Sequence, residues 1–242
     1  MAESKADEHW TEALSLAYAG EGGEFDDKIL AHINSAIGLG LPPTKEAGIR
    51  VIRADVFARR KLWSEVEAEI RRALELDKSL SNSMLYVMAH KLLASSYEKR
   101  GQISRAVKTL EDAIAGLQTL YDPNEEAVSI ASMLCELAVI YMSNRQQISS
   151  AEDQCLANLE HATRVAPDYP QTYAFLGVLF GSKELRSYDP KKAIGYYERH
   201  LTLCPPDDPA RRISQEHIIL LRKEVTTKEQ PKRGGFIKKL FG

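Results

Sequence analysis

The side chains best suited to acid–base, nucleophilic or metal chemistry are scattered along this sequence. It holds 6 histidines and 3 cysteines in 242 residues. No two histidines stand at metal-ligand spacing on one expected helix, and neither His-Glu-x-x-His nor Cys-x-x-Cys occurs. The sequence also lacks a Gly-x-Ser-x-Gly elbow and a dinucleotide-binding glycine fingerprint. We therefore expect no metal site, no cofactor and no enzymatic activity.

Two further chemical candidates have structural explanations. Glu65, Glu67 and Glu69 could pair as catalytic carboxylates, but on a helix most of them should point to solvent. His200 stands where related segments of the chain carry a small residue. We expect it to be a packed or partly exposed histidine rather than a general base.

The composition is that of an ordinary globular protein, with 44% hydrophobic residues, 27% charged residues and a net charge of −2. This balance argues against a nucleic-acid binder, which is usually basic. The sequence has no apolar run of about 18 residues and no signal-peptide pattern at its start. Three widely spaced cysteines suit reduced thiols, and Cys135 and Cys155 fall on apolar helical positions, as small core or groove residues do. These features predict a cytoplasmic protein.

The elements that must position any site are repeated along the chain. Small and apolar residues recur at intervals of 12, 4 and 3 residues in three segments, beginning at Ala17, Ala54 and Ala94. Two later segments keep the intervals of 4 and 3 after a longer first interval. The five sets are Ala17, Ile29, Ile33, Ala36; Ala54, Val66, Ile70, Ala73; Ala94, Ala106, Leu110, Ala113; Ala138, Cys155, Leu159, Ala162; and Gly177, Ala193, Tyr197, His200. This spacing predicts antiparallel helix pairs whose small residues allow close approach.

An aromatic residue follows the first small residue by three places in four of these sets, at Phe57, Tyr97, Tyr141 and Phe180. With these residues the segment from about 10 to 205 resembles the tetratricopeptide repeat (TPR) family. The resemblance implies an all-α, right-handed α-solenoid of antiparallel helix pairs with a C-terminal capping helix, and a function in binding other proteins. The repeats are separated by 37 to 44 residues rather than the family's regular 34, and residues 115–141 resemble its long-helix variant.

The expected domains are a helical repeat domain over 1–227 and a basic, flexible tail over 228–242. The repeat units are placed at about 10–40, 47–80, 87–120, 131–168 and 170–205, with a cap at 208–227. The expected helices cover about 4–20, 26–38, 45–60, 63–77, 80–100, 103–120, 124–144, 149–166, 170–183, 190–204 and 209–226. Asp189 before Pro190 predicts an N-cap followed by proline in the first helical turn.

The first helix of each pair should line a concave groove with residues one face away from the packing positions. We call this set the inner stripe: Val51, Asp55, Lys91, Ser95, Glu98, Cys135, Val139, Met142, Ala174 and Val178. Its first half is polar and its second half is apolar. The apolar half either packs against neighbouring helices or forms a hydrophobic groove for an extended or helical peptide. Only Lys91 suits the carboxylate clamp of some TPR proteins, so we do not expect a clamp.

The tail is the second candidate site, and two glycines separate it from the cap. Its candidate residues are Lys232, Arg233, Phe236, Ile237, Lys238, Lys239, Leu240 and Phe241. Three interpretations stay open: a disordered tail, a basic amphipathic anchor that attaches weakly and reversibly to an anionic membrane, and a peptide that docks in a groove of its own or another copy.

The sequence thus predicts a non-catalytic protein–protein interaction scaffold or adaptor that binds a peptide or helix in its groove. The alternative is a membrane-associated assembly factor recruited by the basic tail. The expected partner is another protein or peptide and not a nucleic acid, and the sequence leaves the oligomeric state open.

Overall fold

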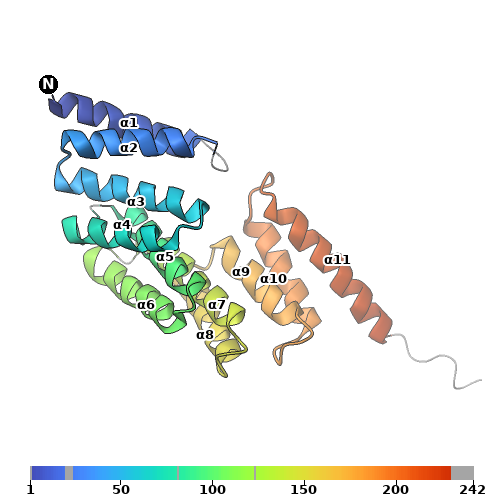
Figure 1. Ribbon diagram of the computed structural model, residues 1–242. Helices are drawn as coiled ribbons and strands as arrows, with labels where there is room; N and C mark the ends of the chain where they lie inside the picture. Colours follow the sequence, from blue (N-terminus) through green and yellow to red (C-terminus); the bar gives the residue numbers. More distant parts are fainter. Residues whose placement is uncertain (1, 20–23, 81, 123, 230–242) are drawn as a thin grey trace, which may run out of the picture. The chain divides into compact units, whose positions relative to one another are not determined.

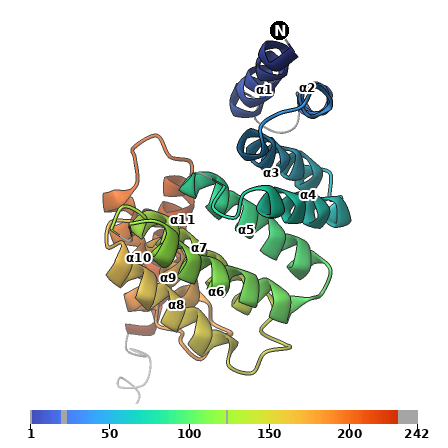
Figure 2. The same cartoon turned by 90° about the vertical axis from the view of Figure 1, so that its left-hand side faces the viewer.

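The computed structural model describes residues 2–19, 24–80, 82–122 and 124–229, and this part of the chain contains eleven α-helices and no strand (Figures 1 and 2). The chain forms two compact units, Met1–Ile140 (unit 1) and Tyr141–Gly242 (unit 2), and the boundary falls inside helix α7. Among the described residues, no helix combines the length and apolar content that a membrane span requires.

All the expected helices are present. They are α1 (Ala2–Ala19), α2 (Asp26–Leu39), α3 (Pro43–Arg59), α4 (Trp63–Leu76), α5 (Ser83–Lys99), α6 (Ile103–Leu120), α7 (Ala127–Ser143), α8 (Ala151–Val165), α9 (Pro170–Gly181), α10 (Pro190–Leu203) and α11 (Ala210–Glu229). Helix α5 begins three residues later than expected because Asn82 caps it. The Asn82 side chain accepts hydrogen bonds from the backbone N–H groups of Met84 and Leu85 at 2.8 and 3.2 Å.

The repeat positions form the core of both units, which confirms the helical register predicted from their spacing. Every one of them is buried except Ala17, which packs against a buried cluster of α1, α2 and α3. The three cysteines are also buried: Cys135 and Cys155 are each 3% exposed, and Cys204 is buried as well. The cysteines are therefore small core residues, and Cys135 is not a groove residue.

Unit 1 is built by adding helix pairs in sequence order. Helices α1 and α2, α3 and α4, and α5 and α6 pack as pairs, as Figures 1 and 2 show. Helix α3 also contacts both α1 and α2, and α5 contacts both α3 and α4. Each new pair therefore covers the apolar faces that the preceding pair leaves open, which a single pair could not do alone.

Ion pairs between helices stabilise the register of unit 1. Asp26 of α2 is 6% exposed and accepts hydrogen bonds from Nε and Nη2 of Arg59 of α3 at 3.0 and 2.7 Å. Glu69 of α4 accepts from Arg50 and Arg53 of α3 at 3.0 and 2.7 Å. Removing Glu69 would leave the partly buried Arg53 without an ion-pair partner among the described residues.

The expectation that most of the Glu65, Glu67 and Glu69 set faces solvent is wrong. The Glu67 and Glu69 side chains are only 14% and 15% exposed. Glu67 lies 2.7 Å from Arg71 Nη2 and accepts from the hydroxyl of Tyr97 at 3.3 Å. Helices α3 and α5 pack against α4 and cover the two glutamates. Arginines neutralise them, so they join helices and do not form a carboxylate pair.

Unit 2 contains helix α8 followed by α9, α10 and α11. Helix α9 packs against α8 and α10, and α10 packs against α11. Asp189 caps α10 as predicted, because its side chain accepts from the N–H groups of Lys191 and Lys192 at 3.1 Å each. Helix α11 buries Ile218 and Leu221. The handedness of the solenoid, the capping role of α11 and the limits of the repeat units and tail stay predictions.

Candidate functional site

The inner stripe of unit 1 is less accessible than the sequence suggested. Val51 is 0% exposed and Cys135 is 3% exposed, so neither can contact a partner at the surface of the folded chain. Their placement in the groove was wrong because α3 and α7 bury more than one face of their residues. Asp55, Lys91, Ser95, Glu98 and Val139 are each half-buried.

The charged members of this stripe are paired within the protein. Lys91 of α5 donates a hydrogen bond to Ser132 Oγ of α7 at 3.2 Å, and its Nζ lies 3.6 Å from Glu136 Oε2. Glu98 lies 3.2 Å from Lys99, and Asp55 forms an ion pair with Arg59. The α7 part of the face is therefore mixed rather than apolar. Ser132 and Glu136, which flank Cys135 on that helix, were not predicted as part of this face.

Two exposed apolar residues extend the stripe and were also missed. Met84 of α5 is 66% exposed and Val128 of α7 is 56% exposed. Each stands seven residues before a stripe member, Lys91 and Cys135 respectively, so it lies on the same side of its helix. Extending the stripe by one heptad toward the N-terminus of each helix would have identified both residues.

In unit 2 the stripe consists of Met142, Ala174 and Val178. Ala174 and Val178 are one turn apart on α9 and share a face. Val178 is 50% exposed, whereas Ala174 and Met142 are half-buried. Val178 is thus the most exposed apolar residue of those predicted for the groove. The tail candidates lie outside the described residues: Lys232, Arg233, Phe236, Ile237, Lys238, Lys239, Leu240 and Phe241.

His200 and Ser214 form the hydrogen bond in unit 2 that most resembles a catalytic pair. His200 Nδ1 lies 2.9 Å from Ser214 Oγ, and the two residues are 1% and 2% exposed. Burial lowers the pKa of His200 and raises the pKa of nearby Cys204 to about 11, so both groups stay neutral at pH 7. The pair is a buried polar link between α10 and α11, which confirms that His200 is a packed histidine.

The fold brings two histidines together that the sequence analysis treated as scattered. His9 of α1 and His32 of α2 lie with their Nδ1 atoms 3.0 Å apart. Two imidazoles supply half of the usual tetrahedral zinc shell. Among the described residues, no group of three or more His, Cys, Asp or Glu side chains is placed to hold a metal ion. The pair therefore acts as a contact between neighbouring helices.

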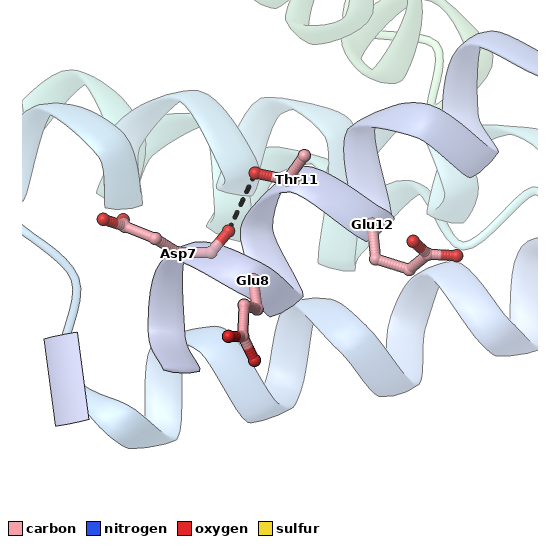
Figure 3. A pocket seen from close by; sticks show the side chains of 4 residues that line it. All are labelled: Asp7, Glu8, Thr11 and Glu12. Carbon is pink, nitrogen blue, oxygen red and sulfur yellow. Dashed lines mark hydrogen bonds between the residues drawn. The ribbon is translucent and has the colours of Figure 1, made fainter. Parts of the chain in front are cut away.

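A shallow hollow on α1 is lined by Asp7, Glu8, Thr11 and Glu12. Figure 3 shows that the three carboxylates point in different directions, while the Thr11 hydroxyl donates to the Asp7 carbonyl at 2.9 Å. Lys45 Nζ lies 2.7 Å from the Asp7 carboxylate. The carboxylates do not converge on one point, so the hollow lacks the geometry of a ligand site.

A second hollow lies within unit 2, between α8, the α9–α10 loop and α10. It is lined by Leu156 of α8, Phe180 at the end of α9 and Tyr196 of α10, together with charged residues. The rings of Phe180 and Tyr196 stack with centroids 5.4 Å apart. Neither hollow contains any member of the inner stripe. This mixture of aromatic and charged lining residues differs from the self-paired surface of unit 1.

Comparison with known proteins identifies the architecture. No protein-family model and no curated protein matches the sequence. BtubC (BKLC) from P. vanneervenii is similar in structure, with 21% identity, a TM-score of 0.56, and coverage of 92% of this chain and 82% of that one. The assembly chaperone of RpL4 (Acl4, residues 1–338) has 15% identity, a TM-score of 0.56, and coverage of 93% and 90%. MamA has 17% identity, a TM-score of 0.51, and coverage of 81% and 92%.

These three solved structures are TPR proteins, and the similarity extends over most of each chain. At such low identity the likeness establishes the fold and not the partner. It agrees with the all-helical pairing and with the buried repeat positions described above. The chain therefore has a TPR-like helical-repeat fold.

Proposed function

We propose that this protein is a non-catalytic interaction scaffold that binds a peptide or helix of another protein along the exposed apolar part of its inner stripe. The TPR-like fold supports this proposal, because stacked helix pairs present extended surfaces for binding.

One observation carries the proposal: apolar side chains of the inner stripe and its heptad extension stand in solvent. Met84 of α5 and Val128 of α7 in unit 1, and separately Val178 of α9 in unit 2, are each at least half exposed. Moving an apolar side chain of this size from water to a fully buried position lowers the free energy of the system by about 1.5–3 kcal/mol. Their side of each helix is therefore where a partner's apolar residues would gain most by binding.

Val178→Glu tests this surface with the least risk to folding, because half of the side chain is already in water. We expect affinity capture from a native lysate to lose the bound partner, and far-UV circular dichroism and melting temperature to stay unchanged. Val139→Glu, at a half-buried position in unit 1, should also weaken capture.

The matched control is Ile219→Glu on α11, where an equally exposed aliphatic side chain lies off the inner stripe. Capture should survive this change. Retention of every partner by the Val178→Glu chain, or equal loss with Ile219→Glu, would remove the inner stripe as the binding surface.

The alternative function is membrane recruitment through the tail. Its support is the sequence of residues 228–242, which combines five cations with four large apolar residues. Flotation with vesicles that contain anionic lipid, of the full chain and of a chain ending at 227, separates the two functions. Tail-dependent flotation would favour the membrane function, and its absence would favour the scaffold.

A further inference from the structure

The hollow of unit 2 has the chemistry of a site for a basic side chain. Lys192 Nζ lies 5.3 Å from the centroid of the Phe180 ring, so a cation already stands over one ring of the stacked pair. Tyr196, the other ring, is half-buried and also lines the hollow. An aromatic face of this kind attracts ammonium and guanidinium groups.

Among the residues that line the hollow, carboxylates outnumber basic side chains. Arg186 satisfies two of them: its backbone N–H donates to Glu152 at 3.1 Å, and its Nη2 lies 3.2 Å from Asp153. Glu160 is exposed and forms no ion pair with any residue that the structure describes. Glu160 and Tyr196 line the same hollow, and burial together with the Glu160 carboxylate raises the pKa of Tyr196. The hollow thus offers one cation an aromatic face and an uncompensated carboxylate.

The basic tail of the same chain starts beside this hollow. Glu224 of α11 accepts a hydrogen bond from the hydroxyl of Tyr188 at 2.6 Å, and Tyr188 lines the hollow. Helix α11 ends at Glu229, about 7 Å further along its axis. Residues 230–242 could extend up to about 45 Å from that point. They carry Lys232, Arg233, Lys238 and Lys239 and no acidic residue.

We infer that the hollow formed by Leu156, Phe180, Tyr196 and Glu160 is a binding site for a lysine or arginine of the protein's own C-terminal tail. The tail cation stacks on Tyr196 and pairs with Glu160. Charge complementarity and the short path from α11 both favour this occupant over a separate basic peptide. The site is separate from the inner stripe, so it stands or falls independently of the scaffold function.

The test compares the full ¹⁵N-labelled chain with a full chain in which Lys232, Arg233, Lys238 and Lys239 are all replaced by glutamine. The observed signals are the backbone amides of Arg186 and Lys192, which line the hollow. We expect these signals to shift on replacement, and to return when a peptide of residues 228–242 is added to the glutamine chain. In the unaltered chain their positions should not depend on protein concentration.

Three further variants of the glutamine chain measure the contacts through the peptide's dissociation constant. Glu160→Gln should weaken binding about threefold and Glu160→Gln with Tyr196→Leu about tenfold. Glu216→Gln on α11, outside the hollow, should leave binding unchanged. Unchanged amide signals on tail replacement, or equal peptide binding by the double variant, would overturn the inference. Concentration-dependent signals would also overturn it, because the tail would then be reaching a second copy.

Discussion

Helix pairs α5/α6 and α9/α10 follow the same repeat pattern but fill it with different side chains. In unit 1 the positions hold Ala94, Ala106, Leu110 and Ala113, and in unit 2 they hold Gly177, Ala193, Tyr197 and His200. All eight are buried. The second pair therefore places a tyrosine ring and an imidazole where the first has an isobutyl group and a methyl group, and it does so without opening the core.

The larger ring of Tyr197 fits because the facing helix has glycine at position 177, where the α5/α6 pair has Ala94. A Cβ atom built on Gly177 would lie 2.6 to 2.8 Å from three ring atoms of Tyr197. Close packing leaves no space for such an overlap. The same repeat positions thus contact each other in both pairs, whereas a larger side chain at one position is matched by a smaller one at the position that faces it.

Gly177→Ala should break this balance and have the largest effect. Alanine is favoured over glycine in a helix by about 1 kcal/mol, but overpacking a full core costs about 1–3 kcal/mol. The ring of Tyr197 is only 2% exposed, so we expect the overpacking cost to lie near its upper limit of about 3 kcal/mol and the net loss to be about 2 kcal/mol. Urea unfolding followed by circular dichroism would measure the loss, and amide exchange in α9 and α10 would locate it.

Two variants control for the helix propensity and for the contact. Gly195 lies on α10 with nothing within 4 Å of its Cβ position, so Gly195→Ala should stabilise by about 0.5–1 kcal/mol. Tyr197→Leu, which restores the residue type of Leu110, should remove most of the additional cost of Gly177→Ala. Additive effects of the two changes would show that the ring does not set the requirement for glycine.

His200 occupies in α10 the repeat position that Ala113 occupies in α6. We expect this histidine to make the stability of unit 2 sensitive to pH. Burial lowers the pKa of His200 below its ordinary value of 6.5, so the folded state favours the neutral imidazole. The unfolded chain takes up the proton first as the pH falls below about 6.5, and stability falls with it. The limiting slope for one proton is about 1.4 kcal/mol per pH unit. Urea unfolding between pH 7.5 and 5 should show this decline.

Replacing both His200 and Ser214 with alanine should flatten that decline, because the titrating group and its hydrogen-bond partner are lost together. Ser214→Ala alone leaves the imidazole buried and should keep the slope. His90 in unit 1 has a pKa lowered by burial as well, so some pH dependence remains in every variant. An identical slope in the double alanine variant would show that His200 contributes none of it.

The repeat spacing was enough to predict the helices, their pairing and nearly all the buried repeat positions, because each depends on local periodicity. It was not enough for residues whose environment depends on neighbouring helices. Val51 was placed in the groove and Glu67 toward solvent. Val51 is buried because α3 packs against α1, α2, α4 and α5, and α5 helps to cover Glu67. The hollow of unit 2 was missed for the same reason, since Glu160, Phe180 and Tyr196 come from three different helices.

Two turns of unit 1 also occupy equivalent places in the repeat but hold different residues. The α5/α6 turn contains Gly101 at φ 73°, and the α3/α4 turn has Lys61 at φ 60° in the equivalent place. Both turns close the same way: the N–H of Gln102 bonds to the Tyr97 carbonyl at 2.8 Å, and that of Leu62 to the Phe57 carbonyl at 2.9 Å. The left-handed region costs residues with a Cβ about 1 kcal/mol and glycine almost nothing.

Lys61→Gly should therefore stabilise the protein, with the smallest of the expected effects at about 0.5 kcal/mol, because the greater freedom of glycine in the unfolded chain offsets part of the gain. The reverse exchange, Gly101→Lys, should destabilise by a similar amount, about 0.5 kcal/mol, because the same two terms act with opposite sign. Arg60→Gly is the comparison variant: Arg60 has φ −84° and gains nothing from glycine, and it also loses its ion pair with Asp27, so this change should destabilise. Urea midpoints of the three variants measured together would resolve these differences. If Lys61→Gly destabilises as much as Arg60→Gly, the lysine stem contributes packing that outweighs its backbone strain, and the two turns are not equivalent.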